Sequence, residues 1–179
     1  MRQFFTPFYA LSLVALLCLI AADRAAAQIV FNKKTISTEA AEQMTNACLD
    51  WYKSHSVRGK PTIWVLNGNG DTIYIKRIDG ANRVGIETAR MKAQSALYLF
   101  RPTRAIADFA KTPSGAPSPG GEAMLVLLNG YISAGGLPIV IDGEVIGAIG
   151  VGGMAPTPAQ GIYPDEQCAQ AGIDAVFKK

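Results

Sequence analysis

The dipeptide Asp142-Gly143 stands between two runs of β-branched and other apolar residues, 137–141 and 145–151. Asp-Gly between such runs is the strongest short-range signal of a β-hairpin, because both residues tolerate the positive φ angles of a tight turn. A second pair of such runs flanks the Asn- and Gly-rich segment 67–71. Hairpins join neighbouring strands that run in opposite directions, so the sequence predicts a mainly antiparallel sheet.

Apolar residues with helical spacing flank and separate these hairpins. We expect helices at 38–55, 86–100, 103–110 and 165–176, and strands at 62–66, 72–78, 124–128, 137–141 and 145–151. Ser37 or Thr38, then Thr103 and Asp165, stand where N-cap residues are favoured. This order predicts an α+β fold with about five strands in a mainly antiparallel sheet flanked by helices.

The N-terminus has the three parts of a secretory signal peptide. Arg2 supplies the positive charge, residues 8–22 form an uncharged and mostly apolar stretch, and Ala25-Ala26-Ala27 offers a cleavage site. A retained membrane anchor is the alternative, but the apolar stretch is shorter than the roughly 20 residues that a spanning helix needs. We therefore predict a signal peptide at 1–27, a single domain at 28–179, and a periplasmic or secreted protein.

Charge and histidine content exclude several classes of function. The net charge is only +3, and no basic run with interleaved aromatic residues is present, which argues against nucleic-acid binding. His55 is the single histidine, so a structural zinc site with several His and Cys ligands is excluded.

Once the signal peptide is removed, two cysteines remain, Cys48 and Cys168. They would either form a disulfide in an oxidising compartment or pack as two buried thiols.

Candidate chemical groups are few. A Ser-His-acid triad cannot be assembled convincingly around His55, which is either a surface residue near a helix end or an axial ligand of haem iron. The glycines of 147–153 lack the Gly-Lys-Ser/Thr ending of a phosphate-binding loop. They would instead let another backbone or a flat ligand approach the strand closely, which makes Gly150, Gly152 and Gly153 candidate ligand contacts.

Three cations are candidates for holding an acidic ligand. Arg90 and Lys92 lie on the second predicted helix, and Arg101 directly follows it. They are either a solvated surface or a positive rim that accepts ligand carboxylates, such as the propionates of haem. The long loops 111–121 and 154–164 would form a lid or the rim of a pocket.

Six segments, in the order in which they occur, resemble one known family. They are 79–81, 89–93, 101–103, 135–139, 142–153 and 165–172. Together they are similar to the GlcG/HbpS-like haem-binding family, formerly a domain of unknown function, which also occurs at the C-terminus of PduO proteins. The resemblance covers residues 37–176.

This resemblance implies a sheet with helices on its faces, oligomeric assembly and, in some members, reversible haem binding. Exported relatives of the HbpS type are associated with haem sensing beside a membrane sensor kinase. The resemblance further implies that Thr103 lies near the haem iron, although the same residue is also the predicted helix cap. The segments 128–133 and 154–164 depart from the family pattern, and both would reshape the rim of a pocket.

Three hypotheses for the function follow. In the first, the exported protein binds haem or a related tetrapyrrole for sensing or sequestration, with His55 or Thr103 at the iron. Its ligand contacts would be Lys92, Arg101, Thr103, Glu122, Gly150, Gly152, Gly153 and Asp165. In the second, the protein is an enzyme for a small metabolite that uses Lys92, Glu122 and Asp165. In the third, a homo-oligomer docks on a membrane sensor. Binding is favoured over catalysis, because the sequence offers no catalytic constellation.

Overall fold

The structure is a computed structural model that describes residues 33–109, 118–127 and 129–178. Residues 34–179 form one compact unit. The predicted signal peptide, 1–27, lies outside the described residues.

The sheet has four antiparallel strands in the order β2-β1-β4-β3. The strands are β1 (Gly59–Asn67), β2 (Thr72–Arg77), β3 (Gly136–Ile141) and β4 (Glu144–Met154). Both predicted hairpins are present, and Asp142 and Gly143 turn with φ angles of 52° and 77° between β3 and β4. The α+β fold is therefore confirmed, but within the described residues the sheet has one strand fewer than the five or so predicted.

The strand predicted at 124–128 is wrong, because residues 124–127 belong to helix α5 (Pro119–Leu127), and residue 128 lies outside the described residues. The hydroxyl oxygen of Ser118 accepts a hydrogen bond from the backbone N–H of Gly121 at 3.1 Å, which is the bond that an N-cap makes. A short apolar run fits a buried strand and a helix equally well, and here the preceding cap selects the helix. The predicted loop 111–121 consequently ends earlier, at Ser118.

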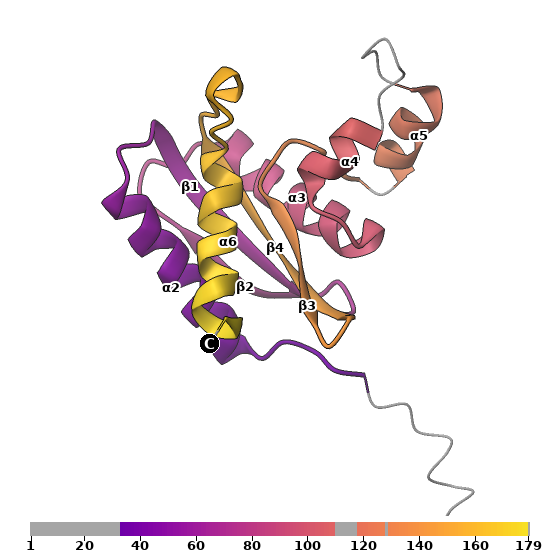
Figure 1. The fold of residues 1–179 in the computed structure, drawn as a ribbon, viewed down its shortest axis with the longest axis horizontal. Helices are drawn as coiled ribbons and strands as arrows, with labels where there is room; N and C mark the ends of the chain where they lie inside the picture. Colours follow the sequence, from indigo (N-terminus) through magenta and orange to yellow (C-terminus); the bar gives the residue numbers. More distant parts are fainter. Residues whose placement is uncertain (1–32, 110–117, 128, 179) are drawn as a thin grey trace, which may run out of the picture. The chain divides into compact units, whose positions relative to one another are not determined.

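The described residues contain four further α-helices (Figure 1). They are α2 (Thr38–Ser54), α3 (Arg83–Leu99), α4 (Thr103–Phe109) and α6 (Pro164–Phe177). Helices α2 and α6 lie side by side on one face of the sheet, and α3 packs on the other face. Side chains alternate along each strand, so Ile149 of β4 packs beneath α2 and α6 while Ala148 faces α3.

The glycines of β4 allow α3 to approach the sheet closely. A Cβ atom on Gly150 would overlap the carbonyl oxygen of Ala89, and one on Gly152 would lie 2.5 Å from the carbonyl oxygen of Gly85. Ala89 and Ala93 of α3 are fully buried at this contact. Of the two interpretations of these glycines, the structure supports contact with another backbone at Gly150 and Gly152.

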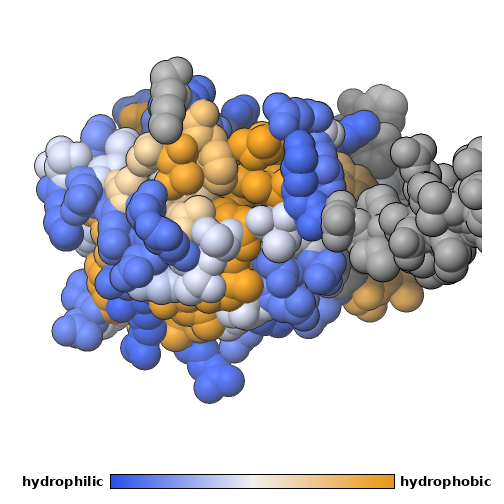
Figure 2. All heavy atoms as spheres, turned by 90° about the horizontal axis from the view of Figure 1, so that it is seen from below, coloured by the Kyte–Doolittle hydropathy of each residue, from blue (hydrophilic) through white to orange (hydrophobic). Residues whose placement is uncertain are grey.

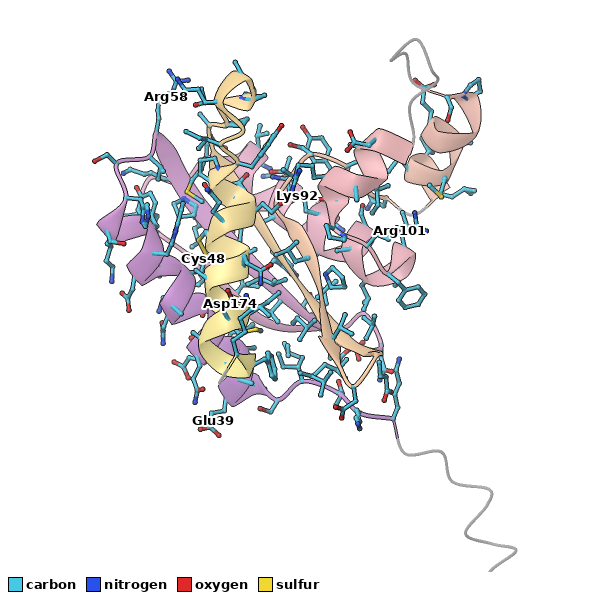
Figure 3. The ribbon with its side chains drawn as sticks, in the orientation of Figure 1. Glu39, Cys48, Arg58, Lys92, Arg101 and Asp174 are labelled. Atoms are coloured by element: carbon cyan, nitrogen blue, oxygen red, sulfur yellow. A yellow bond between two sulfur atoms is a disulfide. The ribbon has the colours of Figure 1, made fainter. Side chains whose placement is uncertain are left out.

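Cys48 and Cys168 are joined by a disulfide. Their Cα atoms are 4.5 Å apart and both residues are fully buried, so the bond links α2 to α6 within the core (Figure 3). The two cysteines are 120 positions apart in the sequence. A cross-link across so long a loop removes much conformational freedom from the unfolded chain.

We expect the double substitution Cys48→Ala and Cys168→Ala to lower the free energy of unfolding by about 2–5 kcal/mol, because the unfolded chain regains that freedom. Urea unfolding followed by circular dichroism measures the effect. The wild-type protein unfolded with dithiothreitol serves as control and should approach the stability of the variant. Equal stability of the variant and the oxidised wild type would contradict a stabilising role for the disulfide.

Candidate functional site

An open pocket of about 360 Å³ lies where β4 ends and α6 begins. The start of α3 forms one wall, the segment leading to β3 forms another, and residues on both sides of the 154–164 loop complete it. Its lining residues are Asn82, Val84, Gly85, Thr88, Lys92, Tyr131, Ser133, Ala134, Gly153, Met154, Ala155, Pro156, Tyr163, Pro164 and Asp165. This volume is at the small end of the range for pockets that bind organic ligands.

A buried ion pair lies in this pocket. Lys92 Nζ of α3 donates to Asp165 Oδ2 of α6 at 2.7 Å and to the carbonyl oxygen of Val151 at 3.0 Å. Only 3% of Lys92 and 7% of Asp165 are exposed. Asp165 Oδ1 also accepts the backbone N–H of Met154 at 3.1 Å. The pair thus connects α3, β4 and α6, and two residues 73 positions apart in the sequence meet at one point.

Burial raises the pKa of the Asp165 carboxyl above its ordinary value, because the charged form loses its hydration. The Lys92 ammonium and the Met154 N–H act against this shift by stabilising the carboxylate. A carboxyl group with a perturbed pKa that also lines a pocket is a candidate functional group.

Asp165 does not cap α6 as predicted. The helix begins at Pro164, its N-cap is Tyr163, and Tyr163 makes no side-chain capping bond. The side chain of Asp165 is instead committed to Lys92 and Met154. An acidic residue at a helix start is equally compatible with both arrangements, so the sequence alone could not distinguish them.

The predicted positive rim of Arg90, Lys92 and Arg101 does not form. Lys92 is buried in its ion pair, whereas Arg90 donates to Gln94 Oε1 at 2.7 Å and pairs with Glu87 at 3.6 Å on the surface of α3. Arg101 is exposed and lines a separate cavity beside α4 and α5. Figure 3 shows Lys92 and Arg101 well apart.

Thr103 is fully buried and is the first residue of α4. Its hydroxyl donates to the carbonyl oxygen of Ser133 at 2.7 Å and accepts the N–H of Gly136 at 2.9 Å. These bonds hold the segment that leads into β3 and carries part of the pocket wall. The hydroxyl of Thr103 therefore bonds to Ser133 and Gly136. It makes no hydrogen bond to the described residues of the first turn of α4, so the predicted cap is wrong. Its position near a haem iron stays a prediction.

The other predicted residues lie at different places. His55 is exposed at the C-terminal end of α2, where its Nδ1 lies 2.7 Å from the carbonyl oxygen of Trp51 and its ring stacks on the indole. Glu122 is exposed on α5. Neither residue lines the pocket, whereas Gly153 does.

Sequence reasoning missed the aromatic part of the pocket wall, which consists of Tyr131 and Tyr163. Arg104 of α4 holds this region by a bidentate ion pair with Glu166, with a shortest distance of 2.8 Å, and its guanidinium lies 5.3 Å from the centre of the Tyr163 ring. One feature of the sequence could have indicated these tyrosines. Segments 128–133 and 154–164 depart from the family pattern, and each contains one of them.

Two kinds of feature are absent from the described residues. No group of three or more His, Cys, Asp or Glu side chains there could hold a metal ion. In the same part of the chain, no helix has both the length and the apolar character needed to cross a membrane.

Comparisons with known proteins give consistent matches. A family model described as "Haem degrading protein HbpS-like" matches residues 36–174. An uncharacterised 15.0 kDa protein of Citrobacter freundii, from the dhaT-dhaS intergenic region, is 30% identical over 123 residues, which are 66% of this chain and 80% of that protein.

Two crystal structures extend the comparison. HbpS is 26% identical, with a TM-score of 0.69 over 84% of this chain and 95% of its own. A complex of PduOC with heme is 22% identical, with a TM-score of 0.67 over 80% of this chain and 96% of its own. At that identity, the likeness to PduOC shows a shared fold.

We expect Asp165→Leu to lower the free energy of unfolding by about 3–5 kcal/mol, because it leaves the buried Lys92 ammonium without its partner. The double variant Lys92→Met/Asp165→Leu should recover most of this loss, since it removes both charges together. Asp174→Asn breaks the exposed pair with Lys178 and should change stability by less than about 1 kcal/mol. Urea denaturation measures all three. A double variant as unstable as Asp165→Leu would show that the loss does not come from an unpaired charge.

Proposed function

Because the chain belongs to the HbpS-like family, we propose that it is an exported protein that binds haem or a related tetrapyrrole in the pocket that contains Lys92 and Asp165. The observation that carries the proposal is the make-up of this pocket, in which an apolar and aromatic wall adjoins a buried ammonium group. The haem in the PduOC complex supports the same class of ligand.

The residues present fit such a ligand. Val84, Pro156 and the two tyrosines offer flat and apolar contacts, as the face of a macrocycle requires. Tyrosine is a known ligand of haem iron, so Tyr131 and Tyr163 are the lining residues that would hold the metal. Bound haem would supply a redox-active iron. The pocket is open, so a ligand larger than 360 Å³ can extend beyond it.

The proposed site of action lies outside the cytoplasmic membrane, where the protein would sequester or sense haem. The sequence supports export through its signal-peptide pattern at 1–27. The Cys48–Cys168 disulfide also supports it, because disulfides persist in oxidising compartments.

We further propose that copies of the chain assemble into a homo-oligomer. Hydrophobic residues reach the surface across much of the face shown in Figure 2, between groups of hydrophilic ones. Phe100, Val126 and Leu127 are among the exposed large apolar side chains. A monomer rarely leaves a large apolar area in water, and a second copy would cover it.

Catalysis on a small metabolite is the second candidate. The sequence suggested Lys92, Glu122 and Asp165 as its titratable groups, and two of them, Lys92 and Asp165, meet in the pocket. Asp165 would take a proton from carbon, and Lys92 would stabilise the negative charge that forms on a neighbouring oxygen. Turnover of a pocket ligand that is lost in Asp165→Asn while binding persists would favour this function over binding alone.

Titration of the mature protein with hemin should shift the Soret band and saturate at a fixed ratio. Tyr131→Phe should weaken binding or change the spectrum, because the phenol oxygen is a candidate iron ligand. Tyr98→Phe is the matched control, since Tyr98 is 40% exposed, Tyr131 is 41% exposed, and Tyr98 does not line the pocket.

The variants His55→Ala and Thr103→Ala extend this titration to the residues expected at the iron from the sequence. An unchanged spectrum in both, with a changed one in Tyr131→Phe or Tyr163→Phe, would place the iron in the pocket. A shift that an unrelated protein reproduces would refute haem binding.

Export predicts that the full chain, expressed in a bacterium with a periplasm, yields a processed protein there. Mass spectrometry should find Gln28 as the first residue and no free thiol at Cys48 or Cys168. Deletion of residues 2–27 should leave the protein in the cytoplasm. An unprocessed chain in the membrane fraction would support the retained anchor instead.

A further inference from the structure

The start of α3 and the start of α6 both border the pocket. Asn82 and Gly85 line it at the first turn of α3, and Pro164 and Asp165 line it at the first turn of α6. These helices have 17 and 14 residues, long enough for their aligned peptide dipoles to give each N-terminus a partial positive charge. Both helix ends therefore favour a negatively charged group in the same space.

Lys92 supplies a second and independent reason to expect such a group. Its ammonium has three N–H donors, and within the described residues its acceptors are Asp165 Oδ2 and the carbonyl oxygen of Val151. The third donor belongs to a side chain that is 4% exposed and lines the pocket. Because the pocket is open, a ligand oxygen can reach this ammonium and accept its third hydrogen bond.

The remaining charges do not cancel this preference. Asp165 is the one acidic residue among those that line the pocket, and it offsets at most the charge of Lys92. Glu166 follows it on α6, but its carboxylate is held by Arg104. The Lys92–Asp165 ion pair is neutral overall, so the partial positive charges of the two helix N-termini favour an anion at this end of the pocket.

We propose that this end of the pocket binds a carboxylate group, with Lys92 Nζ as the charged donor and the N-termini of α3 and α6 around it. This inference rests on the proposed function, because both place the ligand in the same pocket. It adds the chemical group that the pocket recognises. One remaining ammonium donor suits the single charge of a carboxylate. The carboxylate has two sources, either a propionate side chain of a tetrapyrrole or a free small carboxylic acid.

Two variants separate the charge of Lys92 from that of Asp165. Lys92→Met/Asp165→Leu removes the donor without leaving an unpaired charge, and it should weaken carboxylate binding by about 10–100-fold, the value of a hydrogen bond to a charged group. Asp165→Asn keeps the ammonium and removes the opposing carboxylate, so it should bind the carboxylate at least as tightly as wild type. Tyr98→Phe, outside the pocket, should bind as wild type does.

The first experiment uses iron-free protoporphyrin IX and its dimethyl ester, so that no iron ligand contributes. Quenching of the tryptophan fluorescence measures both affinities. The wild-type protein should prefer the free acid by about 10–100-fold, and the double variant should lose this preference. The second experiment compares acetate and succinate with acetamide and succinamide by thermal shift, and competition with protoporphyrin IX tests whether they share the site.

The outcomes separate this inference from the proposed function. Equal binding of acid and ester, with no effect of the small carboxylates, overturns the carboxylate site while leaving tetrapyrrole binding intact. Stabilisation by small carboxylates that depends on Lys92, without porphyrin binding, supports the carboxylate site and overturns the proposed ligand. A preference for the free acid that persists in the double variant refutes the role of Lys92. Absence of all binding refutes both proposals.

Discussion

The contact between the backbones of α3 and β4 determines where the candidate site lies. Gly150 and Gly152 have no side chains to separate the strand from the helix, and Ala89 and Ala93 present the smallest side chains that a helix can offer there. At this separation, the lysine one turn along α3 reaches the carbonyl oxygen of Val151 at 3.0 Å. A bulkier contact would carry Lys92 away from the strand and from Asp165. Small residues at one interface thus position a charged group at another.

The Lys92–Asp165 pair in turn relates three elements that are distant in sequence. Its hydrogen bonds reach Val151 and Met154 on β4, while the two side chains come from α3 and α6. Ion pairs of this kind add little net stability, since desolvation opposes the attraction between the charges. Their geometry is nevertheless demanding, because an alternative packing would leave a charge buried alone. The pair therefore specifies the arrangement of the pocket more than it stabilises the fold.

Local patterns predicted the hairpins and the main helices, because their signals lie within a few residues of each element. The Asp142-Gly143 turn and the Ser37 cap of α2 are examples. The predicted roles of individual side chains were wrong where a residue distant in sequence binds the side chain in place of the local backbone. Asp165 and Thr103 both stand at helix starts, yet their side chains bond to residues far along the chain. The tyrosines of the pocket were missed for the same reason, since only tertiary packing brings their two segments together.

The disulfide has a consequence for the timing of ligand binding. Cys168 follows Asp165 by less than one turn of α6, so the bond to Cys48 fastens the part of the helix that carries the acidic member of the pair. Before oxidation, packing alone holds that helix against α2. Under the proposed export, a newly made chain in the reducing cytoplasm would have a less firmly assembled pocket than the oxidised, mature protein. The pocket would then be firmly assembled only after the disulfide has formed, so the newly made chain would bind less ligand inside the cell than the mature protein binds outside it.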